Sequence, residues 1–324
     1  MKRPIYTIGL IATVCCVTTA CNRTPRNMCC EVVDETYVHK YGVEVPQQDW
    51  TARGEHGQVI STLNNGVVVT KSYAGGELDD DTTYTFPHST TIEKVETYSN
   101  GVLVKEVLNT LSGIPTQETV YKDDRSKDMT IWYEKGSPKS VEHYDSSGLL
   151  IEGTYYDARH QLDARVVNGE GMRFVRDGYG QLLSKDTIQG GALTTRTTYH
   201  PNGTPNEITP YVNGIVEGQR KTYLPAGEPN TVETWENGKQ TGITVFYLNG
   251  EKYSEVPFTN GIRTGVERRY RDGKEVVQEI AWKDNQKHGL SKNYVGDAEQ
   301  AQWFYQDKPV SKNKFESMSG TLTQ

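Results

Sequence analysis

Histidines and carboxylates are the side chains in this sequence that could hold a metal ion or move a proton. The seven histidines are scattered, with no pair at the i, i+4 spacing of a helical metal site and no cysteine beside them. They are His39, His56, His88, His143, His160, His200 and His288. There is no Gly-x-Ser-x-Gly, phosphate-binding loop or HExxH motif. We therefore predict that the protein is not an enzyme and takes no metal, cofactor or small-molecule substrate.

One acidic run offers oxygen atoms of the kind that Ca²⁺ prefers. It consists of Glu77, Asp79, Asp80 and Asp81, and it lacks the glycine and the distal glutamate of a calcium-binding loop. We interpret it as a solvated loop. His288 precedes a repeated glycine at a position where the residue type varies, so we expect its replacement to have almost no effect on stability.

The cysteines place sulfur chemistry at the N-terminus, because all five lie at or before position 30. They are Cys15, Cys16, Cys21, Cys29 and Cys30. Lys2 and Arg3 precede a mostly apolar run at 5–17, which is short for a membrane span but suits the apolar region of a secretory signal. Three small residues at 18–20 then lead to Cys21.

This N-terminus resembles that of a bacterial lipoprotein, although Thr18 stands where that family usually has Leu or Val. The resemblance implies a signal peptide at 1–20, a diacylglycerol on the sulfur of Cys21 and an acyl chain such as palmitate on its amine. Two or three acyl chains hold a protein stably at a membrane. Asn22, where Asp would favour inner-membrane retention, points to the outer membrane. The alternative is an ordinary secretory signal with an incidental cysteine.

The net negative charge of the chain argues against partners that are themselves strongly negative. Without Lys2 and Arg3 the chain has 33 basic against 42 acidic residues. DNA, RNA and anionic lipid headgroups are bound by clusters of Lys and Arg, and no such cluster is present. We therefore predict no nucleic acid partner.

An aromatic or apolar residue returns about every 23 positions over most of the chain, which is typical of a repeat architecture. The series is Tyr73, Tyr98, Tyr121, Tyr144, Val166, Ile188, Tyr211, Trp235, Phe258, Trp282 and Tyr305. A second series lies about 12 residues later and includes Tyr223, Tyr247, Tyr270 and Tyr294. Asn-Gly pairs such as Asn237-Gly238 follow the first series and predict hairpin turns. Each repeat is thus a strand, a turn, a strand and a turn, with the aromatic residues expected to form ladders.

The segment 211–296 resembles the MORN-variant repeats, whose units read aromatic-x-Asn-Gly, then Gly, then an aromatic residue about five positions later. Trp235-Glu-Asn-Gly-Lys-Gln-Thr-Gly242 followed by Tyr247 is one such unit. The resemblance implies an all-β fold, an elongated single-layer twisted antiparallel sheet of consecutive β-hairpins. Members of that family act mostly as scaffolds or protein-binding surfaces, and some bacterial ones are antitoxins.

These observations divide the chain into five parts. We predict a signal peptide at 1–20, a flexible tether at 21–45, an N-terminal cap and first hairpin at 46–72, repeats at 73–310 and a disordered tail at 311–324. At roughly 4.8 Å between neighbouring strands, the repeat sheet is expected to be an extended rod of about 100 Å. The predicted function is a non-catalytic envelope lipoprotein whose sheet binds an unknown protein partner. An antitoxin-like inhibitor and a cell-wall polysaccharide-binding protein are the alternatives.

Overall fold

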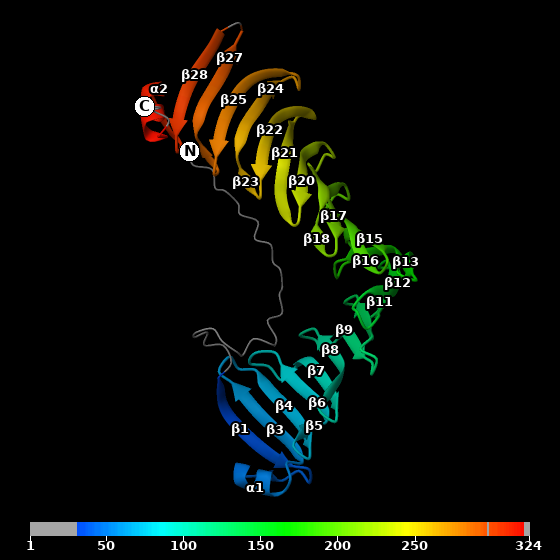
Figure 1. The fold of residues 1–324 in the computed structure, drawn as a ribbon. Helices are drawn as coiled ribbons and strands as arrows, with labels where there is room; N and C mark the ends of the chain where they lie inside the picture. The colour runs from blue at the N-terminus through cyan, green and yellow to red at the C-terminus, as the bar shows by residue number, and fades with distance from the viewer. Residues whose placement is uncertain (1–30, 297, 321–324) are drawn as a thin grey trace.

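The computed structural model describes residues 31–296 and 298–320 (Figure 1). Cys21, Cys29 and Cys30 lie outside this part, and so does the predicted signal peptide. The described chain forms an open antiparallel sheet in which consecutive strands pair, as for β7 (Ile92–Ser99) with β8 (Val102–Asn109). The predicted all-β, elongated sheet of consecutive hairpins is confirmed.

The strands of the first half are β1 (Val32–His39), β2 (Glu44–Val45), β3 (Gly57–Leu63), β4 (Val68–Ala74), β5 (Glu77–Leu78), β6 (Asp80–Thr85), β7, β8, β9 (Pro115–Tyr121), β10 (Lys127–Trp132), β11 (Pro138–Tyr144), β12 (Leu150–Tyr156), β13 (Leu162–Val167), β14 (Glu170–Arg176) and β15 (Leu182–Gln189). Those of the second half are β16 (Ala192–Tyr199), β17 (Pro205–Val212), β18 (Ile215–Val216), β19 (Gly218–Tyr223), β20 (Pro229–Glu236), β21 (Lys239–Leu248), β22 (Glu251–Thr259), β23 (Ile262–Arg263), β24 (Gly265–Arg271), β25 (Glu275–Lys283), β26 (Gln286–Lys287), β27 (Gly289–Val295), β28 (Ala298–Tyr305) and β29 (Lys308–Val310). The two helices are α1 (Gln47–Ala52) and α2 (Lys312–Met318).

The Asn-Gly turns have the backbone that their sequence predicts. Asn237 and Gly238 both have positive φ, 50° and 72°, as a type I′ hairpin turn requires. Asn260 and Gly261 repeat this geometry with φ of 51° and 82°. Because these turns match the right-handed twist of the strands, each turn places the strand that follows it directly beside the strand that precedes it.

The sheet bends into an open arc rather than the straight rod that we expected (Figure 1). Register shifts recur in half of the strand pairings, for example between Thr97 and Tyr98 and between Arg269 and Tyr270. A β-bulge bends its strand and increases the local twist. Since the bulges return with the repeat, their bends add up along the sheet.

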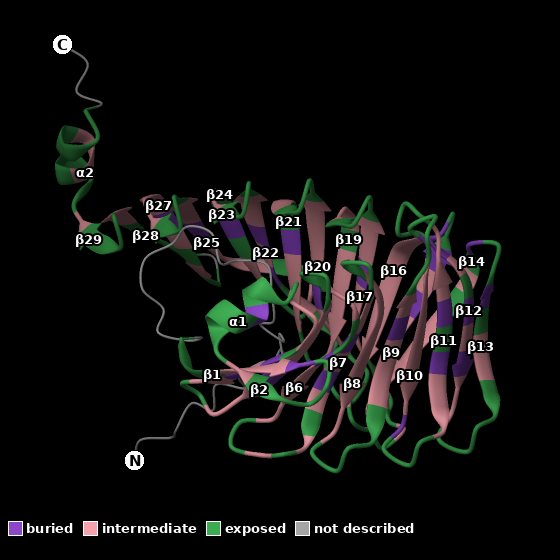
Figure 2. Cartoon of the chain, turned by 90° about the horizontal axis from the view of Figure 1, so that it is seen from below, coloured by how far each residue is buried: buried purple, intermediate pink, exposed green. Residues whose placement is uncertain are grey.

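The two surfaces of the sheet differ in burial. We call the surface that carries Trp235, Phe258 and Trp282 the aromatic face, and the surface that carries Ile243, Val266 and Leu290 the exposed face. On the aromatic face, residues two positions before the ring are buried, such as Val256 (5% exposed) and Ile280 (1%). Ile243 and Val266 on the exposed face are 52% and 43% exposed. Figure 2 shows the buried residues as short bands along successive strands.

The expected ladders of stacked rings are absent from the described residues, where no ring contact joins two members of the aromatic series. Members of successive repeats are two strands apart, which is about 9.6 Å, whereas aromatic pairs need roughly 4.5–7 Å. The last member is also corrected. Phe304, not Tyr305, lies opposite the repeat glycine Gly289, as Trp282 lies opposite Gly265.

The described part of the predicted flexible tether is ordered, so that prediction was wrong from residue 32 onward. Strand β1 pairs with β3 over most of its length, and β2 turns back onto Tyr37 and Val38. Trp50 of α1 is 4% exposed and contacts the rings of Tyr37 and Tyr73. The segment has β-branched and aromatic residues suited to a strand, but it lies outside the repeat register.

The predicted disordered tail was also wrong over the residues of α2. Ser311 caps this helix, its side chain accepting a hydrogen bond from the backbone N–H of Lys314 at 3.3 Å. Phe315 packs against Trp303 and His288, with ring centroids 4.9 Å and 5.2 Å apart. The helix is therefore held at the end of the sheet by the ring contacts of Phe315.

Candidate functional site

The acidic run at 77–81 lies in strands as well as in a loop, so its interpretation as a solvated loop was only partly correct. Asp80 and Asp81 belong to β6. Asp79 accepts a hydrogen bond from the backbone N–H of Asn100 at 3.1 Å, and Asp81 accepts one from Thr97 at 2.6 Å. These carboxylates tie one hairpin to the next. No group of three or more His, Cys, Asp or Glu side chains within 31–296 and 298–320 is placed to hold a metal ion.

Several of the histidines make separate structural contacts. His143 pairs across strands with Asp128 at 2.6 Å, and His200 contacts the carbonyl of Tyr223 at 2.9 Å. His288 lies between Tyr305 and Phe315, with ring centroids 4.9 Å and 5.2 Å away. The expectation that replacing His288 would have almost no effect on stability is therefore revised, because the ring of His288 contacts Phe315 and so helps to hold α2 against the sheet.

The aromatic face contains a set of carboxylates that the sequence analysis missed. They stand two positions before the aromatic or apolar residue in alternate repeats, and they are Glu96, Glu142, Asp186 and Glu233. The intervening repeats have Thr119, Ala164 and Thr209 at this position. The two-repeat spacing corresponds to four strands, so like charges stay roughly 19 Å apart. Had the sequence been compared over pairs of repeats, this alternation would have been visible.

Each of these carboxylates has partners on neighbouring strands. Asp186 has a fully covered side chain and accepts hydrogen bonds from Arg173 at 2.7 Å and from Arg196 at 2.8 Å. Burial alone would raise the pKa of Asp186, but the hydrogen bonds from Arg196 and Arg173 outweigh it and hold the pKa below its ordinary value. Its oxygens are already engaged, so Asp186 is suited to holding strands together rather than to acid–base chemistry.

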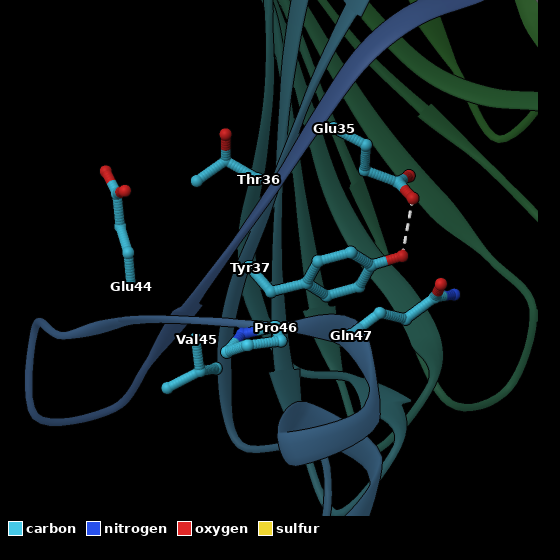
Figure 3. Close-up of a pocket in the computed structure, with 7 residues that line it drawn as sticks. All are labelled: Glu35, Thr36, Tyr37, Glu44, Val45, Pro46 and Gln47. Atoms are coloured by element: carbon cyan, nitrogen blue, oxygen red, sulfur yellow. Dashed lines mark hydrogen bonds between the residues drawn. The ribbon is translucent and has the colours of Figure 1, made fainter.

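An open cleft lies beside β1 and β2, with a volume of about 550 Å³ (Figure 3). Among its polar side chains, Tyr37 and Glu35 bond to each other, whereas Thr36 and Glu44 point away from this pair. The hydroxyl of Tyr37 donates to Glu35 at 2.5 Å, and Ser61 donates to the same carboxylate at 3.1 Å. The hydrogen bond with Glu35 raises the pKa of Tyr37 to about 12. We therefore assign this cleft no catalytic set.

The exposed face of β21–β28 has the most regular array of accessible side chains. One row is apolar and crosses the strands through Ile243, Pro257, Val266, Ala281, Leu290 and Trp303. Beside it runs a charged row, Glu255, Arg268, Glu279 and Lys292. Next come Tyr270 and Tyr294, whose hydroxyls donate to Glu255 at 2.6 Å and to Glu279 at 3.0 Å. Rows form because strand alternation places every second residue on one face.

The charges of this face are paired rather than collected into one sign. Lys252 contacts Glu255 at 2.9 Å, Arg268 contacts Glu279 at 3.2 Å and Lys292 contacts Glu299 at 3.1 Å. The hydrogen bond from Tyr270 and the ion pair with Lys252 lower the pKa of Glu255. The face therefore offers apolar contact area bordered by fixed charges, which suits binding of another macromolecule.

Comparisons with known proteins identify no family for this chain. No family model matches the sequence, and no curated protein matches it. Among solved structures, a porin-like protein from Bacteroides uniformis aligns over 75% of this chain and 87% of its own length, at 10% identity and a TM-score of 0.13. A score that low supports no argument about fold or function. The described residues include no helix with the length and apolar character needed to span a membrane.

Proposed function

We propose that the protein is a lipid-anchored lipoprotein of the cell envelope, non-catalytic, whose sheet is a scaffold for a partner protein. The observation that carries this proposal is the exposed face of β21–β28, where apolar, charged and tyrosine side chains repeat in register. The resemblance of the segment up to Cys21 to a lipoprotein signal supports the anchor. The resemblance of 211–296 to MORN-variant repeats supports a binding role.

The anchor is tested by replacing Cys21→Ala and following labelled palmitate in the producing bacterium. Wild type should incorporate the label, and the variant should not and should stay uncleaved or be released in soluble form. A Cys29→Ala, Cys30→Ala variant is the matched control, because it removes two nearby thiols and leaves Cys21. Equal labelling of wild type and Cys21→Ala would contradict the anchor.

The binding face is tested separately with a photo-cross-linking residue at Val266. A second chain carries it at Val102, which is 64% exposed and lies beside a turn in the first half of the sheet. We expect the same discrete product from probes at Val266 and Ile243, and its absence with Val102. Identical products at all three positions would show that the exposed face of β21–β28 has no special role.

A further inference from the structure

The two ends of the sheet are protected to different degrees. At the first end, β1 has a register shift between Val32 and Asp34, and β2 covers part of its outer side. Bulges and short covering strands discourage a sheet edge from pairing with another chain. At the other end, β28 pairs with β27 without a shift, β29 covers Trp303 to Tyr305, and Phe315 of α2 packs on Trp303 and Tyr305. The five residues from Ala298 to Gln302 are all exposed.

The main-chain groups on the outer side of β28 follow from the hairpin with β29. Gln306 and Asp307 form its two-residue turn, with φ of 48° and 66°, and Tyr305 lies opposite Lys308. Alternate residues of a strand direct their N–H and C=O groups to the same side. The main-chain N–H and C=O groups of Trp303 therefore point toward β29. Those of Ala301 and Glu299 point to the same side, beyond the end of β29, where no strand lies among the described residues.

We propose that this edge of β28 pairs with the same edge of a second copy of the chain. The two strands run antiparallel about a two-fold axis at Gln300, with Glu299 opposite the partner's Ala301. Both of these residues direct their main-chain groups outward, so the register forms two hydrogen-bonded pairs. The axis is normal to the sheet, and the aromatic faces of both copies lie on the same side.

The neighbouring registers are less favourable for reasons visible in the structure. Placing Glu299 opposite the partner's Glu299 brings two carboxylates together, and like charges directly opposite are destabilising. Placing Ala301 opposite the partner's Ala301 requires Trp303 to pair as well, but Trp303 already pairs with Val310 of β29. Of these three registers, only the one centred on Gln300 pairs the outward main-chain groups of Glu299 and Ala301 without opposing two carboxylates or displacing β29.

The inference is tested by disulfide trapping in full-length chains whose five native cysteines, Cys15, Cys16, Cys21, Cys29 and Cys30, are serine. In the proposed register the two Gln300 Cα atoms are about 4.5 Å apart, within the range for a disulfide. Gln300→Cys should therefore give a reducible covalent dimer upon mild oxidation. Gln302→Cys is the matched control, because its two Cα atoms would be roughly 14 Å apart. Equal dimer yields from both variants, or none from Gln300→Cys, would overturn the proposal.

Charge reversal then tests the register itself. Ala301→Glu is then added to the Gln300→Cys chain. In the dimer, the new carboxylate of each copy lies opposite Glu299 of the other copy, which makes two repulsive pairs. The dimer yield should therefore fall roughly tenfold. A further Glu299→Lys replaces both repulsions with attractions and should restore the yield. Circular dichroism of each chain confirms that it has kept its sheet. A loss that Glu299→Lys fails to reverse in folded chains would exclude this register.

Discussion

Gly265 lies directly opposite Trp282 on the neighbouring strand. The ring of Trp282 has the guanidinium of Arg263 at 4.0 Å from its centroid, and its indole N–H donates to Glu267 at 2.8 Å. A Cβ added at Gly265 would lie against Pro257, and no atom of the Trp282 ring would be within 4 Å of it. The same pairing recurs in neighbouring repeats, as Gly218 with Trp235, Gly242 with Phe258 and Gly289 with Phe304. Glycine and aromatic residue therefore return together in the sequence.

Replacing Gly265→Ala should destabilise the protein by about 2–3 kcal/mol. The added Cβ would lie 2.9 Å from Cγ of Pro257, and φ at this position is +119°, which side chains rarely tolerate. Gly250→Ala is the control, because φ is +80° there and nothing lies within 4 Å of the added Cβ. It should cost about 1 kcal/mol. Chemical denaturation measures both, and equal costs would contradict the steric explanation.

Replacing Trp235→Ala should cost about 3 kcal/mol, the low end for a buried aromatic residue, because its ring is only partly covered. The change also removes the indole donor that contacts Glu233 at 2.8 Å. Denaturation midpoints of the variant and the wild type give the difference. A cost below that of Gly250→Ala would show that the aromatic series does not hold the repeats together.

Replacing His288→Ala should loosen α2 while leaving the middle of the sheet unchanged, because His288 contacts Phe315 and Tyr305 at the last strands. Hydrogen exchange is the suitable measurement, since it reports local opening. We expect faster exchange at 312–318 and unchanged exchange in β11 and β12. His160→Ala, which removes a stacked contact with Tyr156 far from α2, is the control.

Replacing Asp186→Asn should cost about 3 kcal/mol at neutral pH, because two arginines lose their carboxylate. The value is at the low end because Arg173 and Arg196 keep 23% and 35% of their side chains exposed. The pKa of Asp186 is lower in the folded than in the unfolded chain. Its contribution is therefore complete above the unfolded pKa, about 3.9, and is lost as pH falls through the folded pKa. The free energies of unfolding of variant and wild type should converge in acid, and a constant gap would contradict this assignment.

Small-angle scattering should distinguish the arc from the alternatives. A globule of this length has a radius of gyration of about 19 Å. A straight rod of about 100 Å, built from strands 4.8 Å apart, has one of about 29 Å. The arc in Figure 1 should give a value between the two. A value at either limit would contradict the observed curvature.

The sequence by itself determined the class of fold, because Asn-Gly turns and a fixed aromatic spacing act locally and return in every repeat. It also determined that Val166 and Ile188 take the place of aromatic residues, and both are almost fully buried. Tertiary structure alone decided the curvature, since each bulge contributes a small bend whose sum no single repeat reveals. It likewise decided that Asp186 meets Arg173 and Arg196, which lie on neighbouring strands. The segments 32–39 and 312–318 were mispredicted because β1 and α2 are ordered by contacts with residues outside their own segments.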